Sequence, residues 1–301
     1  PSYQGDTKMQ PDRLDNESPP ARPTRRRVLK LAVAGMATAA AAGGIIDAMF
    51  LEPKRIDVTR PVIELPDWPP AWDSLRVVHL TDLHLGRLIG ADYLTRAVEM
   101  ANAARPDLAV LTGDFVTHFG ESNGSLDEIL AGLRAPLGRL AVLGNHDHAV
   151  GADRVADLLT RAGVTVLRND SRLLMRDGAA LCVAGVEDMW RGRPDLAHAT
   201  RGVGPDVPRI VLVHNPDYAD NMPEGVRADV LLCGHTHGGQ VRLPWIGAPR
   251  LPIRNRRYAS GLAAGPRCCV YVSRGLGMVG VPVRLNCRPE MPVLTFRRRR
   301  A

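Results

Sequence analysis

The chain has 301 residues, 45% hydrophobic and 24% charged, which excludes disordered and collagen-like classes and indicates a folded globular protein. Its net charge of +7 comes from the two ends, since residues 1–30 carry +3 and residues 297–300 carry +4. The neutral remainder, with few aromatic residues over the whole chain (4%), offers little to a nucleic acid, so we expect no specific nucleic-acid partner.

The N-terminal part has the composition of an export signal. Residues 1–23 are polar and rich in proline, and we predict a disordered tail there. In residues 24–50, a basic cluster precedes sixteen uncharged residues from Leu31 to Ile46. The segment resembles a twin-arginine signal, which implies passage through the twin-arginine translocation machinery and a protein that is secreted or associated with the membrane or cell wall. An uncleaved anchor from Leu31 to Leu51 is the alternative, disfavoured by the charge of Asp47 and because a span needs about 20 apolar residues.

Residues 51–301 read as one domain of alternating strands and helices. Five apolar runs end near residues 80, 111, 143, 213 and 233, each at a cluster of turn-forming polar residues, as buried strands do. Helical periodicity lies between some of them, at 94–101 and 155–162. Later runs at 181–184, 269–273 and 293–296 indicate a second sheet. The predicted fold is a four-layer αββα sandwich of two mixed sheets flanked by helices.

The five cysteines do not indicate a disulfide framework. Their number is odd and their spacing matches no zinc-binding pattern. Cys182, Cys233 and Cys269 lie in strand-like runs, where cysteine acts as a small hydrophobic residue. We therefore expect no essential disulfide.

Side chains suited to binding metals follow the five apolar runs. They are Asp82, His84, Asp114, Asn145, His146, Asp147, His214, His235 and His237. An α/β fold places its site at the carboxyl ends of its strands, so residues distant in sequence can meet there. The pattern predicts a metal site at this edge of the sheets.

The same residues carry a family resemblance. The chain resembles the calcineurin-like metallophosphoesterases in five motifs over about residues 75–285: Asp82-x-His84, Gly113-Asp114, Gly144-Asn145-His146-Asp147, His214 and Gly234-His235-Thr236-His237. With the signal and with residues 237–244 and 272–277, it resembles more narrowly the exported bacterial phosphodiesterase branch with a minimal core.

The resemblance implies a binuclear centre in which Asp114 bridges two ions. One ion is expected to bind Asp82, His84, Asp114 and His237. The other is expected to bind Asp114, Asn145, His214 and His235. Two divalent cations about 3.5–4 Å apart offset phosphate charge and activate a bridging hydroxide. Nitrogen and oxygen ligands without thiolate suit Mn, Fe, Zn, Ni or Co.

Other residues receive expected roles beside the metals. His146 is expected to protonate the leaving group, and Asp147 to orient the ring of His146. Five further residues lie near the motifs and are candidates for substrate binding, with structural capping as the alternative for each: Arg87, Asn215, Gln240, Arg242 and Arg274.

The predicted protein is a dimetal phosphoester hydrolase, active outside the cytoplasmic membrane and monomeric. Its expected substrate is a phosphodiester or a pyrophosphate-containing small molecule or lipid. A metal-dependent nuclease is one alternative, which the neutral body disfavours. An envelope-associated binding protein with a degenerate metal site is another, which the complete set of expected ligands disfavours.

Overall fold

The computed structural model describes residues 24–118 and 126–299, so the predicted disordered tail lies outside the described residues. The chain divides into two compact units, one ending at Gly44 and one running from Ile45 to Ala301. Each unit is described by itself below.

The N-terminal helix is longer than the sequence indicated. Helix α1 spans Arg25–Ile46, and helical structure continues through η1 (Asp47–Leu51) and η2 (Glu52–Lys54). The charged Asp47 does not end it; this side chain instead forms an ion pair with Arg55, at 3.2 Å. Between Arg25 and Lys54 the helix has the length and apolar character to cross a membrane, features that a signal sequence near an N-terminus also has.

The second unit contains two sheets. The first has the strand order β1-β13-β3-β4-β5-β6, and β2 also pairs with β13. Its strands are β1 (Asp57–Thr59), β2 (Val62–Leu65), β3 (Leu75–Leu80), β4 (Leu108–Thr112), β5 (Arg139–Val142), β6 (Thr165–Val166) and β13 (Glu290–Arg298). Strands β3, β4 and β5 are parallel, whereas β13 is antiparallel to β3, so the sheet is mixed, as predicted.

The second sheet has the order β11-β12-β10-β9-β8-β7. Its strands are β7 (Asp170–Arg176), β8 (Ala179–Gly185), β9 (Arg209–Leu212), β10 (Val230–Cys233), β11 (Gly261–Ala264) and β12 (Cys269–Val272). Strands β9 and β10 are buried along their whole length. This burial explains their unbroken apolar sequences, which are typical of covered parallel strands.

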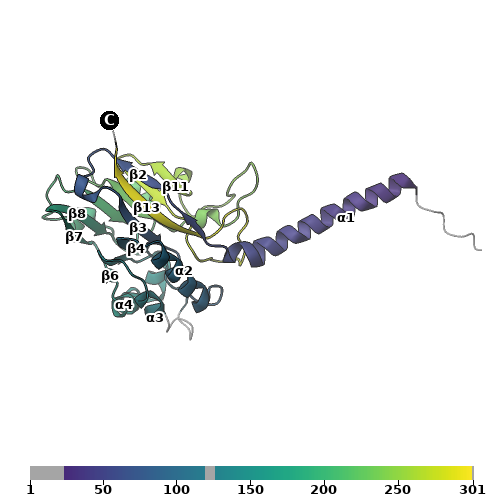
Figure 1. The fold of residues 1–301 in the computed structure, drawn as a ribbon, viewed down its shortest axis with the longest axis horizontal. Coiled ribbons are helices and arrows are strands. Elements are labelled where there is room, and N and C mark those ends of the chain that lie inside the picture. The colour runs from purple at the N-terminus through teal and green to yellow at the C-terminus, as the bar shows by residue number, and fades with distance from the viewer. Residues whose placement is uncertain (1–23, 119–125, 300–301) are drawn as a thin grey trace, which may run out of the picture. The chain divides into compact units, whose positions relative to one another are not determined.

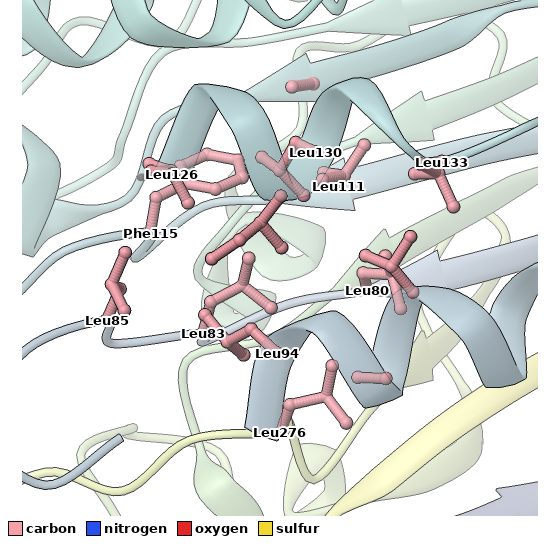
Figure 2. Packing of buried hydrophobic residues seen from close by; sticks show 14 of the residues in the cluster. Leu80, Leu83, Leu85, Leu94, Leu111, Phe115, Leu126, Leu130, Leu133 and Leu276 are labelled. Carbon is pink, nitrogen blue, oxygen red and sulfur yellow. The ribbon is translucent and has the colours of Figure 1, made fainter. Parts of the chain in front are cut away.

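The layers are arranged as the sequence predicted. One apolar cluster fills the space between the sheets, and another joins the first sheet to α2 (Ala91–Ala103), α3 (Leu126–Ala131) and α4 (Asn145–Arg161) (Figure 1). Figure 2 shows Leu94, Leu126 and Leu130 of these helices packed near Leu80 and Leu111 of the sheet.

Only short helical segments cover the outer face of the second sheet in the described residues. They include α5 (Leu196–Ala199), η5 (Pro216–Asn221) and η7 (Arg256–Tyr258). The remaining short helices are η3 (Pro70–Trp72) and η6 (His237–Gly239). All five cysteines are free, with Cys182 and Cys233 buried and Cys269 half-buried.

The apolar packing between the sheets can be tested at Leu232 of β10, which is fully buried there. Leu232→Ala should lower the free energy of unfolding by about 2–5 kcal/mol, because it removes buried methyl groups and leaves a cavity. The measurement is urea unfolding. Leu173→Ala on β7, where the side chain is half exposed, is the matched control and should change stability by at most about 0.5 kcal/mol. Equal losses in the two variants would contradict this packing.

Candidate metal centre

The predicted ligands lie where the carboxyl ends of both sheets meet. Strands β3, β4 and β5 of the first sheet lead to Asp82 and His84, to Asp114 and to Asn145, while β9 and β10 of the second lead to His214 and to His235 and His237. Backbone hydrogen bonds join neighbouring loops within each sheet, from Asp82 N to Gly113 O (2.9 Å) and from Gly234 N to His214 O (3.1 Å).

The backbone at these loops is held in an uncommon conformation. Positive φ angles occur at Asp82 (52°), His84 (49°), Asp114 (56°), His235 (70°) and His237 (50°). Residues other than glycine seldom adopt this left-handed region, and such strain persists only where the surroundings enforce it. The loops are therefore built to direct these side chains at the cost of local backbone energy.

Two glycines give the carboxylates room. A Cβ atom on Gly144 would lie 2.2 Å from Oδ1 of Asp114, and one on Gly234 would lie 2.3 Å from Oδ2 of Asp82. Both distances are far below van der Waals contact, so any side chain at either position would displace a carboxylate.

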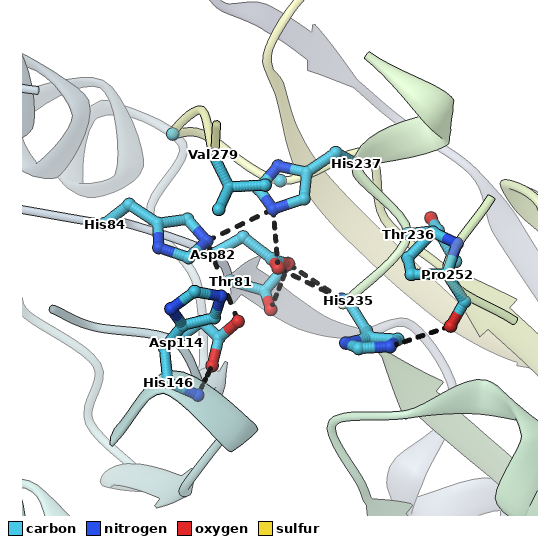
Figure 3. A network of polar contacts seen from close by, with 12 residues as sticks. Thr81, Asp82, His84, Asp114, His146, His235, Thr236, His237, Pro252 and Val279 are labelled. Atoms are coloured by element: carbon cyan, nitrogen blue, oxygen red, sulfur yellow. Dashed lines mark hydrogen bonds and ion pairs between the residues drawn. The ribbon is translucent and has the colours of Figure 1, made fainter. Parts of the chain in front are cut away.

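Asp82, His84 and His237 form the first group of buried side chains that could hold an ion (Figure 3). Nε2 of His237 lies 3.1 Å from Nε2 of His84 and 3.3 Å from Oδ1 of Asp82. The hydroxyl of Thr81 and the backbone N–H of His235 donate to the Asp82 carboxylate, which fixes its orientation.

Asp114, His214 and His235 form the second group, also buried. Oδ2 of Asp114 lies 3.1 Å from Nε2 of His214 and 3.7 Å from Nε2 of His84. One carboxylate oxygen thus faces both groups. Oδ1 of the same carboxylate accepts a hydrogen bond from the backbone N–H of His146, at 2.8 Å.

The second group fits a bound cation by its hydrogen-bonding pattern. Nδ1 of His214 lies 2.6 Å from the carbonyl of Thr112, and Nε2 of His235 lies 3.0 Å from the carbonyl of Pro252. A carbonyl only accepts, so both of these nitrogens carry the proton. The opposite nitrogens of the two neutral rings then present lone pairs to each other across 3.2 Å. Such a contact requires a positive charge between them, which a metal ion or a proton can supply.

Burial sets the charge of the other imidazoles. It lowers the pKa of His84 to about 4 and of His235 to about 3, and it places the pKa of His237 well below its usual value. These rings are neutral at pH 7, which is the form that binds a metal. Burial also raises the pKa of Asp82 to about 6, so burial disfavours the ionised carboxylate and a neighbouring cation would stabilise it.

His214 behaves differently from the other three ligand histidines. Burial lowers the pKa of His214, but the charge of Asp114 and the hydrogen bond to it raise the value to about 10. The same His214 charge and hydrogen bond oppose burial at Asp114 and hold the pKa of that carboxyl well below its usual value. Without metal, a proton on His214 thus supplies the positive charge in the second group.

Asn145 and His146 begin helix α4 at the edge of the site. Oδ1 of Asn145 is buried without a hydrogen-bond partner, as expected for an oxygen reserved for a cation. Both residues line a cavity of about 430 Å³ together with Asp114, His235 and His237. The ring of His146 meets that of His84 edge-on, with centroids 5.0 Å apart.

Asp147 has a different role from the expected one. Its Oδ2 accepts the backbone N–H groups of Asp114 (2.7 Å) and Gly144 (2.9 Å), and its Oδ1 accepts those of Phe115 (2.8 Å) and Val116 (3.3 Å). The side chain is fully buried among these amides, so it positions the loop that carries Asp114 instead of orienting the ring of His146.

The five candidates for substrate binding have different surroundings in the structure. Gln240 lines the cavity, but Arg274 does not serve as a free cation, because it pairs with Asp57 (2.9 Å) and Glu290 (3.1 Å). Asn215 is fully buried and caps η5 through its Oδ1. Arg242 donates to the hydroxyl of Ser260, at 3.1 Å, and Arg87 is exposed in the loop after His84.

Among the cavity residues that were not predicted from the sequence are Trp190 and Arg250. Trp190 packs edge-on against His235, with centroids 4.4 Å apart, and Arg250 lies on the cavity wall. Neither belongs to a motif, and each reaches the site on a loop between or after the ligand motifs. Arg250 supplies a positive charge near the site, which suits an anionic substrate.

The fold and the site define a metal-dependent hydrolase of phosphoesters. The chain matches the calcineurin-like phosphoesterase family over residues 75–239 and belongs to that family. Two buried His/Asp groups, one beside the other, provide its metal-binding centre, and the identity of the metal is not set by these donors.

Relatives at about one third identity cover most of the chain. It is 33% identical to the uncharacterized metallophosphoesterase YkuE of Bacillus subtilis, over 91% of this chain and 98% of that protein. It is 32% identical to the phosphodiesterase YaeI of Escherichia coli, over 90% and 98% respectively. It is 30% identical to the UDP-2,3-diacylglucosamine pyrophosphatase LpxG of Chlamydia trachomatis, over 76% and 86%.

Asp147→Asn tests the structural role of this carboxylate. The amide keeps the shape but loses one acceptor oxygen, so we expect a cost of about 1–3 kcal/mol for each backbone N–H left without a partner, together with reduced metal content. Urea unfolding and elemental analysis measure the two effects. Asp157→Asn, on the exposed face of the same helix, is the control. A variant that matches wild type in both measurements would overturn the role.

Proposed function

We propose that this phosphoesterase hydrolyses phosphodiesters or pyrophosphate bonds outside the cytoplasmic membrane. The observation that carries the proposal is the Asp114 carboxylate, which faces both groups of buried ligands and lines a cavity of about 430 Å³.

In this proposal Asp114 would contribute to both of two metal sites. Asp82, His84, Asp114 and His237 would hold the first ion. Asp114, Asn145, His214 and His235 would hold the second. When bound, the ions offset phosphate charge and activate water for in-line attack. The chain's own contribution is to fix the ligands, through the second hydrogen bonds of His84 to Thr117, of His214 to Thr112 and of His235 to Pro252.

His146 is proposed as the proton donor to the leaving group. Its backbone N–H is bound by Asp114, and its half-buried side chain lines the cavity beside Asn145. It can therefore reach a substrate oxygen without binding metal itself. The leaving group, which is an alcohol or a phosphate, would lie on this side of the site.

The preference for diesters and pyrophosphates is supported by the cavity and by relatives. Trp190 offers an aromatic face and Arg250 a positive charge along its wall, and these side chains can contact the substituents of a phosphodiester. YaeI is named a phosphodiesterase, and LpxG acts on a pyrophosphate-containing sugar nucleotide. Residues 24–50 support export, through their likeness to a twin-arginine signal.

His146→Ala should keep its metals and lose rate by about 100- to 10,000-fold, because it lacks the general acid. The loss should be smaller for an ester with a good leaving group, which departs without a proton. Steady-state kinetics with p-nitrophenyl and alkyl esters make the comparison. His198→Ala, at an exposed histidine, is the control. A loss of equal size for both leaving groups would exclude the acid role.

A substrate panel tests the reaction class directly. With added Mn²⁺, kcat/KM for bis(p-nitrophenyl) phosphate should exceed that for p-nitrophenyl phosphate by at least about tenfold, which is about 1.4 kcal/mol in transition-state binding. A UDP-linked sugar, a phospholipid and DNA complete the panel. Preference for the monoester would contradict the proposal, and salt-dependent cleavage of DNA would instead indicate a nuclease.

Export is tested by the paired substitution of Arg25 and Arg26 with lysine. If residues 24–50 act as a twin-arginine signal, this variant should remain as precursor in the cytoplasm, as measured by cell fractionation and immunoblotting. Arg27→Lys keeps the pair and should be exported normally. Export of the double variant at the wild-type level would remove this part of the proposal.

A further inference from the structure

A small hairpin carries large apolar side chains into solvent. Leu243 and Gly247 exchange two backbone hydrogen bonds of 2.9 Å, so Pro244, Trp245 and Ile246 form the tip. Trp245 is fully exposed (103%) and Ile246 is 70% exposed. Trp245 also has a φ of 61°, an unfavourable conformation for a bulky residue. We call residues 243–247 the apolar hairpin.

A second set of exposed apolar side chains is Met49, Phe50 and Leu51 of η1. Residues 284–287 join this set to the apolar hairpin. On one side, Arg284 N donates to Ala48 O, and the amides of residues 286 and 287 donate to the Glu52 carboxylate. On the other side, Arg242 N donates to Leu285 O, at 2.8 Å. Residues 284–287 therefore hold both apolar sets in place through hydrogen bonds of their backbone.

The stretch of sequence that contains the hairpin is strongly basic, although residues 31–296 are neutral overall. Residues 230–289 contain nine arginines and no aspartate or glutamate. Two of these arginines, Arg274 and Arg284, are used inside the fold by Glu290 and by backbone carbonyls. Arg250, Arg254 and Arg257 are exposed on the segment that follows the hairpin.

We propose that the apolar hairpin, Met49–Leu51 and the adjacent arginines form a docking surface for an anionic lipid bilayer. Tryptophan and isoleucine gain from burial at the boundary between headgroups and acyl chains, and arginines gain from anionic headgroups. A second copy of the chain fits this surface less well, because a symmetric contact would bring the exposed arginines of the two copies, such as Arg250, against each other.

The docking surface borders the metal cavity. The hairpin begins six residues after His237, and Gln240 between them holds the backbone of residues 279 and 281 through three side-chain hydrogen bonds. Val281 and Arg250 line the cavity and are themselves exposed. A docked surface would therefore bring the cavity to phosphoesters of the headgroup layer. The docking itself does not depend on the proposed function.

The test measures where Trp245 lies in the full chain reconstituted into vesicles. Wild type and Trp245→Phe are compared, and the difference in their emission isolates Trp245 from the other three tryptophans. In phosphatidylglycerol vesicles with brominated acyl chains, most of this difference emission should be quenched. Quenching should be several-fold weaker in phosphatidylcholine or at 1 M salt, because both remove the attraction of the arginines.

Trp190→Phe is the matched control, since Trp190 lies in the cavity and its loss should leave the bromolipid response intact. Difference emission that ignores brominated lipid and is quenched by iodide would place the hairpin in water and overturn the proposal. Emission shielded from both quenchers would show a protein cover, such as a second copy, and would overturn it as well. Equal quenching in both lipids would contradict the role of the arginines.

Discussion

The central constraint in this structure is the burial of two carboxylates and four imidazoles at one place. Too little positive charge lies beside them to offset the negative charge of the carboxylates. Asp82 and Asp114 are 0% and 2% exposed, and burying an ionised carboxylate is costly unless positive charge lies beside it. If both rings were neutral, the lone pairs of His214 and His235 would also face each other across 3.2 Å. Two cations would relieve both conflicts, so the two groups of buried ligands are suited to bind metal as one electrostatic unit.

The rest of the fold serves to hold that unit together before metal binds. Two sheets bring their carboxyl ends to one edge, strained loops direct the ligands, and Gly144 and Gly234 leave space where any side chain would clash. Asp147 connects the strand loops by accepting four backbone amides. Such preorganisation means that little conformational energy is spent when substrate arrives.

Much of this could be predicted because each ligand directly follows an apolar run. The strand periodicity placed Asp82, Asp114 and His214 at strand ends, and the order of the motifs indicated the family. The role of Asp147 could not be predicted, because three of the four amides that it binds lie 31 to 33 positions away.

Other features escaped prediction for related reasons. Arg274 next to a motif suggested a substrate contact, but its partner Asp57 lies 217 positions earlier. The exposure of Trp245 depends on the hairpin that Leu243 and Gly247 close, and no periodicity marks it. The charge of Asp47 argued against a longer apolar segment, but helical structure continues past it to Lys54 and Asp47 pairs with Arg55.

The most direct test of the account is anomalous X-ray diffraction from crystals of the protein loaded with Mn²⁺. We expect two anomalous peaks about 3.5–4 Å apart, one beside His84 and His237 and one beside His214 and His235, with the Asp114 carboxylate in contact with both. A single peak, or two peaks of which only one touches Asp114, would contradict the shared-carboxylate centre.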